Sequence, residues 1–231
     1  MKTIGVVGGI GPESTLEYYR QMIAAYRAQV ADGSYPLILI HSINLQQMVN
    51  LFTAGRHAEA TDVLADSLQR LARAGADFAL MAANTPHLLF DAIRARSPIP
   101  LLSIVEVTRA AAQARGFHRL ALFGSRFTMQ GRIYADTFAA AGIAVVSPQP
   151  AEQDYIHEKY MGELVLGNIL PETRRELLAI VERMRTRDQI DGLILGGTEL
   201  PLILHDGMAE GVPFLDTTEI HVRAAIAQLL A

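Results

Sequence analysis

The segments IPLLSIVE (residues 99–106) and VPFLDTTE (residues 212–219) repeat one pattern 113 residues apart. Each has an aliphatic residue and proline, an apolar pair, a polar helix start and then glutamate, and an Ala-rich helix pattern follows. A second pair, ALMAANTPH (79–87) and LILGGTELP (193–201), recurs at nearly the same spacing. Although βα units resemble one another in general, paired segments at one spacing predict an internal duplication.

Apolar runs alternate with amphipathic stretches along the chain. Near-continuous apolar strands separated by helices are typical of a parallel sheet covered on both faces. Strands are expected at Thr3–Gly8, Leu37–Ile40, Phe78–Ala82, Arg119–Gly124 and Gly192–Leu195. Helices are expected at Glu13–Val30, Glu59–Ala74, Leu88–Ala95, Met129–Ala141, Glu158–Leu166 and Glu172–Met184.

The duplication and the alternation together predict an α/β fold with two parallel-sheet halves. The N-terminal half is expected to comprise residues 1–98 plus 208–231, and the C-terminal half residues 99–207. A pseudo-twofold axis would relate the two halves and bring their equivalent strand ends face to face across a cleft.

Ligands of open α/β sheets bind outside the carboxyl ends of the strands. The turns at 83–87 and 197–201 follow equivalent strands in the two halves. We therefore expect both turns to line one pocket, with residues 8–14 and 124–129 close by.

Composition excludes several classes of protein. Half of the residues are hydrophobic and the formal net charge is −4, which indicates a globular chain. No long Lys/Arg run is present, so neither nucleic acid nor an anionic membrane is expected as a partner. The N-terminus MKTIGVVGG lacks the apolar region of a signal peptide, and no apolar run could cross a bilayer. We expect a cytoplasmic protein.

The sequence has no cysteine and seven histidines. Disulfides, Cys-containing metal sites and thiol nucleophiles are therefore excluded. The histidines do not form the HxxxH or HExxH spacing, so a metal site is not expected.

Two glycine turns open helices at equivalent points of the halves. Gly8–Ser14 (GGIGPES) lacks the glycine spacing of a dinucleotide site, and no Walker lysine follows it. Glycines admit a ligand close to the backbone and helix starts attract anions, so a carboxylate-binding turn and an ordinary tight turn both explain it. In Gly124–Met129 (GSRFTM), Ser125 and Thr128 offer hydroxyls, although capping explains at least one of them more simply.

Polar side chains also follow the paired strands. Asn84 and Thr85 place an amide and a hydroxyl at one strand end, which suits a ligand carrying both ammonium and carboxylate. Thr198 and Glu199 repeat the arrangement, and Glu199 could meet a substrate ammonium. Helix capping and first-turn charge explain the same residues locally.

Five segments together resemble the aspartate/glutamate racemase family, in order and at matching separations, over essentially the whole chain. They are MKTIGVVGGIGPESTLEYY, the NTPH turn, LFGSRFTMQG, LILGGTELPLIL and PFLDTTEIH. The resemblance implies two Rossmann-like halves, usually dimeric, with the active site between them. It also implies interconversion of the enantiomers of acidic amino acids without a cofactor.

In that family a cysteine typically precedes the Asn-Thr pair and another precedes the Thr-Glu pair. One thiolate removes the α-proton, and the other thiol returns a proton to the opposite face. Here these positions are Ala83 and Gly197, and neither side chain can carry a proton. Ser125 stands where the family commonly has threonine, and Asn44 where relatives often carry an acid. The substrate-binding residues that the resemblance implies are Gly9, Ile10, Gly11, Arg56, Asn84, Thr85, Ser125, Thr128, Thr198 and Glu199.

Three interpretations stay open at this point. The chain could be a natural isomerase with other acid and base groups, for which His87 and Glu199 are the nearest candidates and Glu13 is a more distant one. It could instead bind an acidic amino acid or diacid without turning it over. An engineered, inactivating Ala83 is the third, but it does not readily explain Gly197. In each case we expect a small carboxylate ligand, a homodimer and neither cofactor nor metal. A nucleotide-dependent oxidoreductase lacks support, because the glycine fingerprint is missing.

Overall fold

The computed structural model describes residues 2–209 and 211–231. The chain forms two compact units, Met1–Ile104 with His221–Ala231, and Val105–Ile220. It passes to the second unit after Ile104 and returns after Ile220. This division differs from the expected one at both boundaries. The larger difference is in residues 208–220, which lie in the second unit because Val212–Asp216 pairs with the sheet of that unit.

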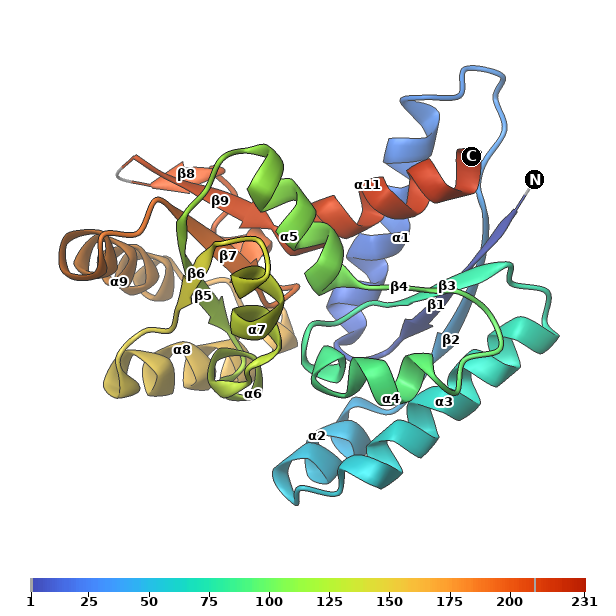
Figure 1. The fold of residues 1–231 in the computed structure, drawn as a ribbon, viewed down its shortest axis with the longest axis horizontal. Coiled ribbons are helices and arrows are strands. Elements are labelled where there is room, and N and C mark those ends of the chain that lie inside the picture. Colours follow the sequence, from blue (N-terminus) through green and yellow to red (C-terminus); the bar gives the residue numbers. More distant parts are fainter. Residues whose placement is uncertain (1, 210) are drawn as a thin grey trace. The chain divides into compact units, whose positions relative to one another are not determined.

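The first unit contains a four-stranded parallel sheet with the order β2–β1–β3–β4 (Figure 1). The strands are β1 (Thr3–Gly8), β2 (Leu37–Ser42), β3 (Phe78–Met81) and β4 (Leu101–Leu102). The helices are α1 (Pro12–Arg27), α2 (Leu45–Thr53), α3 (His57–Arg73), the 3₁₀ helix η1 (Thr85–Leu89), α4 (Phe90–Arg94) and the last part of α11 (Thr217–Leu230).

Alternation along β1 sends side chains to two helical layers. Val6 of β1 and Leu80 of β3 are buried in one cluster with Met22 of α1 and Ile226 of α11. Successive strand residues point to opposite faces, so Gly5 faces the other side. There a Cβ would lie 3.3 Å from the Cβ of Leu71 in α3. Helices therefore cover both faces, as the apolar strands predict.

The second unit contains a five-stranded sheet with the order β6–β5–β7–β9–β8. Its first four strands are parallel, and β8 is antiparallel to β9. The strands are β5 (Arg119–Gly124), β6 (Ala144–Val146), β7 (Gly192–Gly196), β8 (Met208–Ala209) and β9 (Val212–Asp216). The helices are α5 (Ile104–Ala114), α6 (Arg126–Gln130), α7 (Ile133–Ala139), α8 (Pro150–Gly162), the 3₁₀ helix η2 (Leu164–Leu166), α9 (Pro171–Asp188) and α10 (Leu200–Ile203).

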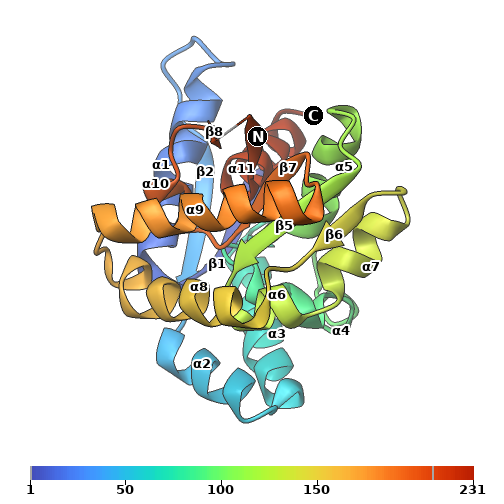
Figure 2. The ribbon, with the colours of Figure 1, turned by 90° about the vertical axis from the view of Figure 1, so that its left-hand side faces the viewer.

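Helices α8 and α9 lie side by side against one face of this sheet (Figure 2). Ile156 and Tyr160 of α8 and Ile180 of α9 share a buried cluster with Phe123 of β5 and Leu195 of β7. This packing matters for the site because it brings α8 over the end of β7.

The two units repeat one topology. In each, the first parallel strand lies between the second and the third, and the fourth follows the third. The two Pro-led segments form the fourth strand and the start of the next helix in each unit, as β4 with α5 and β9 with α11. The fold class of two Rossmann-like α/β units is thus confirmed, and the shared topology supports the duplication.

Several helices differ from their expected bounds. The expected helix at 88–95 begins as η1 at Thr85, and the one at 129–141 is interrupted between α6 and α7. Helix α8 starts at Pro150, eight residues earlier than expected, because Gln149 and Glu152 form a capping box. In the described part of the chain, no helix combines the length and apolar character that a membrane span requires.

Candidate functional site

The first glycine turn lies against the end of β2. Gly9 has a φ of 81°, and a Cβ there would lie 2.2 Å from the carbonyl oxygen of Ile43. Glycine is therefore required both by the backbone angle and by the space. The Gly9 N–H donates to Thr15 Oγ1 at 2.8 Å, and Ile10 is partly buried. The turn is thus fixed by its own helix.

The same turn also reaches the end of β3. Ser14 is fully buried, and its Oγ lies 2.8 Å from the Gly11 carbonyl and 3.2 Å from the Ala82 carbonyl. The start of α1 is a weaker anion site than the glycines suggest, because Pro12 has no N–H and Glu13 adds negative charge to the first turn.

Ala83, Asn84 and Thr85 follow β3 as expected. Ala83 and Asn84 are each 5% exposed, and Thr85 is half-buried. Asn84 occupies the position before η1, but its side chain does not cap that helix. The capping interpretation of the Asn84 side chain is therefore wrong.

His87 is a buried structural residue. Its Nδ1 lies 3.0 Å from the Ala83 carbonyl oxygen, and its Nε2 accepts the Ile104 N–H at 3.2 Å. The ring stacks on Phe90 with centroids 5.1 Å apart. Burial lowers the pKa of His87 to about 4, so the imidazole is neutral at physiological pH. With both nitrogens bound to the backbone, His87 is poorly suited to transfer a proton to a ligand.

Arg56 lies just before α3. Its exposed guanidinium pairs with the Glu59 carboxylate, which occupies the donor fork that a ligand carboxylate would use. Arg56 and Asn44 line an open pocket of about 590 Å³. Asn44 caps α2 by accepting the Gln47 N–H at 3.0 Å.

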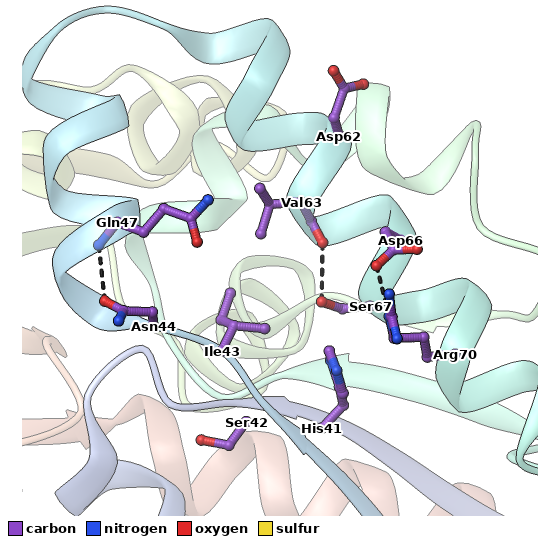
Figure 3. A pocket seen from close by; sticks show the side chains of 10 residues that line it. All are labelled: His41, Ser42, Ile43, Asn44, Gln47, Asp62, Val63, Asp66, Ser67 and Arg70. Atoms are coloured by element: carbon purple, nitrogen blue, oxygen red, sulfur yellow. Dashed lines mark hydrogen bonds and ion pairs between the residues drawn. The ribbon is translucent and has the colours of Figure 1, made fainter.

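An adjoining open pocket of about 480 Å³ shares Asn44, Gln47, Asp62 and Val63 with it (Figure 3). His41, Ser42 and Ile43 approach it from the end of β2. Asp62, Val63, Asp66, Ser67 and Arg70 line it from α3.

In the second unit, the end of β5 adjoins the end of β7. A Cβ on Gly124 would lie 2.7 Å from the Gly196 carbonyl oxygen. Ser125 Oγ accepts the Thr128 N–H at 3.3 Å and lies 3.2 Å from Thr128 Oγ1. This geometry agrees with the capping interpretation of Ser125, and both hydroxyl residues are buried.

The space beside Gly197 is occupied by Tyr160 of α8. A Cβ on Gly197 would lie 2.5 Å from Cε2 and 2.9 Å from Cζ of this ring. Tyr160 is 8% exposed. Tyr160 was not among the expected site residues, because it lies inside a helix 37 positions before Gly197 and outside every motif.

The Tyr160 hydroxyl donates to Glu199 Oε2, and Thr198 Oγ1 donates to the same oxygen at 3.0 Å. Glu199 is 1% exposed and Thr198 2%. Burial, and next the charge of Glu199, raise the pKa of Tyr160 well above its usual value. The phenol therefore stays a protonated donor, and Glu199 is a positioned acceptor.

Each unit thus has a buried, ordered strand end that carries hydrogen-bond donors and acceptors. At the positions of the two expected catalytic side chains stand Ala83 and Gly197. Within residues 2–209 and 211–231, no cluster of three or more His, Asp or Glu side chains could hold a metal ion.

Comparison with known proteins gives consistent results across the chain. The sequence pattern of the Asp/Glu/hydantoin racemases matches residues 7–225. An aspartate racemase homologue from Pyrococcus horikoshii OT3 is 32% identical, with all of both chains covered and a TM-score of 0.84. A candidate Asp/Glu racemase from Yersinia pestis is 29% identical over all of both chains, with a TM-score of 0.90. The broad specificity amino-acid racemase RacX of Bacillus subtilis is 23% identical, covering 99% of this chain and 98% of its own.

Proposed function

Because this chain belongs to the Asp/Glu/hydantoin racemase family, we propose that it binds a small acidic amino acid without racemising it. The ligand class is supported by the names of the relatives, which include an aspartate racemase homologue and an amino-acid racemase. It is also supported by the side chains at the strand ends, Asn84 and Thr85 in one unit and Thr198 and Glu199 in the other. In this proposal the polar side chains at each strand end are ligand-binding groups, with Gly9–Gly11, Ser125 and Thr128 as supporting turns.

The absence of two-base chemistry is supported most strongly at Gly197. The Tyr160 ring occupies the space that a thiol at this position would need. A simple loss of cysteine would leave a gap, whereas here the packing is complementary to glycine. Ala83 lacks a titratable group as well, and the nearest imidazole, His87, has both nitrogens bound to backbone groups. Racemisation by His87 and Glu199 is therefore the less favoured alternative.

Proton exchange tests the chemical part of this proposal. The protein is incubated with L-aspartate or L-glutamate in D₂O, and deuterium at Cα is followed by NMR. We expect no exchange above the rate without protein. Exchange at an enzyme-like rate would show that other groups carry the proton and would reject the binding-only function.

Ligand-induced thermal stabilisation tests the binding part. A panel of D- and L-aspartate, D- and L-glutamate and succinate is compared at equal concentrations. A ligand at 100 times its Kd stabilises the folded state by about 2.7 kcal/mol, which raises the Tm measurably. The Thr198→Ala variant serves as the weakened-site control. If no acid in the panel shifts the Tm, the ligand class does not carry over from the family.

A further inference from the structure

Gly197 and Tyr160 are packed as one unit. Three atoms of the Tyr160 ring and hydroxyl would lie between 2.5 and 3.1 Å from a Cβ at position 197. These distances are shorter than a carbon–carbon van der Waals contact, so a side chain at 197 and this position of the ring exclude each other.

Tyr160 is held in place from several sides. Its ring belongs to the buried cluster formed with Ile156 of its own helix and with Leu195 and Leu200 around the end of β7. Its hydroxyl is fixed by the Glu199 carboxylate. Moving the ring would break this hydrogen bond and open a cavity, so the arrangement is a stable feature of the second unit.

The effect on Glu199 is to orient a buried carboxyl group. Oε2 receives both the Tyr160 and the Thr198 hydroxyls. A carboxylate has acceptor capacity for about four hydrogen bonds. At a buried position a carboxylate attracts an ammonium group and repels a second carboxylate strongly.

We infer that Tyr160 determines ligand specificity at the second unit's strand end, by filling the space beside Gly197 and fixing Glu199 to receive an ammonium group. The inference rests on the proposed function, because it takes an amino acid as the ligand. It makes Tyr160 a positioning residue that acts through Glu199. The ligands selected are amino acids, in preference to dicarboxylic acids that lack the amine.

Isothermal titration with a matched ligand pair tests this role. Succinate has the two carboxylates of aspartate but no ammonium group. Kd values for succinate and for the tighter-binding enantiomer of aspartate are measured on the unaltered protein, Tyr160→Phe, Glu199→Gln and Tyr155→Phe. Tyr155 is the control because it lies on the same helix and is partly buried. The hydroxyl that donates to Glu199 belongs to Tyr160.

We expect the unaltered protein to prefer aspartate by at least tenfold. Tyr160→Phe should raise the Kd for aspartate about tenfold, because the hydrogen bond that positions Glu199 is lost. It should change the Kd for succinate less than twofold. Glu199→Gln should abolish the preference, and Tyr155→Phe should retain it. Because Glu199→Gln keeps the side-chain volume, it supplies the test even if Tyr160→Phe does not fold.

Three outcomes would overturn the inference. If Tyr160→Phe weakens both ligands equally, the role of Tyr160 is only structural. If Glu199→Gln keeps the preference for aspartate, the ammonium is recognised elsewhere. In both of these cases the proposed function stands. If the unaltered protein binds neither ligand, the proposed function fails, and this inference fails with it.

Discussion

Gly197 shows how one residue identity depends on a distant side chain. Glycine is required at this position because the ring of Tyr160 fills the space that a Cβ would need. The cause differs from that at Gly9, where a left-handed backbone angle also requires glycine. The two positions look alike in the sequence, but only Gly9 is constrained by its backbone angle as well as by space.

The packing at Gly197 predicts a measurable coupling. Gly197→Ala forces a methyl group into the Tyr160 ring and should lower the free energy of unfolding by about 1–3 kcal/mol. In the Tyr160→Ala background, Gly197→Ala should lower the free energy of unfolding much less, because the ring is absent. Urea unfolding of the four proteins in this double-mutant cycle gives a coupling energy, which we expect to exceed about 1 kcal/mol.

Gly162→Ala is the matched control for that cycle. Gly162 ends the same helix, and a Cβ there would meet no atom within 4 Å. We expect it to change stability little in either background. A coupling near zero between residues 197 and 160 would show that the ring moves aside without cost.

At the scale of elements, caps decide where several helices begin. Helix α8 begins at Pro150 because the Gln149 backbone N–H donates to Glu152 Oε2 at 2.9 Å. The pattern predicts a start near Glu158, since the first turns of α8 have no clear apolar stripe. A glutamine N-cap is outside the Ser/Thr signature of a capping box, which is why this start was missed.

The start of α11 provides a test of capping energy. Asp216 Oδ1 accepts the N–H groups of Thr218 at 2.8 Å and Glu219 at 3.0 Å. Asp216→Ala removes both bonds and should lower the free energy of unfolding by roughly 1–2 kcal/mol, measured by urea unfolding. Asp136→Ala removes an exposed salt bridge with Arg132 and should lower the free energy of unfolding by less than about 1 kcal/mol. Equal losses for the two variants would contradict the capping role of Asp216.

At the scale of the whole molecule, buried histidines lie where the chain changes units. His87 accepts the N–H of Ile104, the last residue before the first crossing. His221 follows the second crossing, and its ring lies 2.9 Å from the Tyr18 hydroxyl and 3.3 Å from the Leu102 carbonyl oxygen. Both chain crossings are thus attached to the core of the first unit by neutral imidazoles.

These imidazoles predict loss of stability in acid. Burial lowers the pKa of His87 to about 4, and burial with the nearby His87 lowers that of His221 to about 3. The unfolded chain binds their protons below about pH 6.5 and the folded chain does not. Their contribution to stability is therefore complete above about pH 6.5 and is lost as pH falls towards 4 for His87 and towards 3 for His221.

For each imidazole, the free energy of unfolding should fall by roughly 1 kcal/mol per unit of decreasing pH. Urea unfolding between pH 7 and pH 4 measures it. His221→Gln should reduce the slope by about one imidazole's share. An unchanged slope in His221→Gln would show that this imidazole takes up its proton in the folded state.

The sequence by itself determined the fold class, the two repeated units and the strand-end turns. Hydrophobic periodicity and paired glycine, Asn-Thr and Thr-Glu turns are local signals, so they are readable without coordinates. The absence of thiols at positions 83 and 197 was likewise visible in the residues alone.

The tertiary structure alone decided what surrounds those positions. Tyr160 reaches Gly197 through the packing of α8 on the sheet, His87 is saturated by backbone groups, and β9 belongs to the second unit because it pairs with β7. Apart from the contact of His87 with the Ala83 carbonyl, these contacts join residues in different elements. Close packing and hydrogen-bond satisfaction fix them in three dimensions, and no local pattern records them.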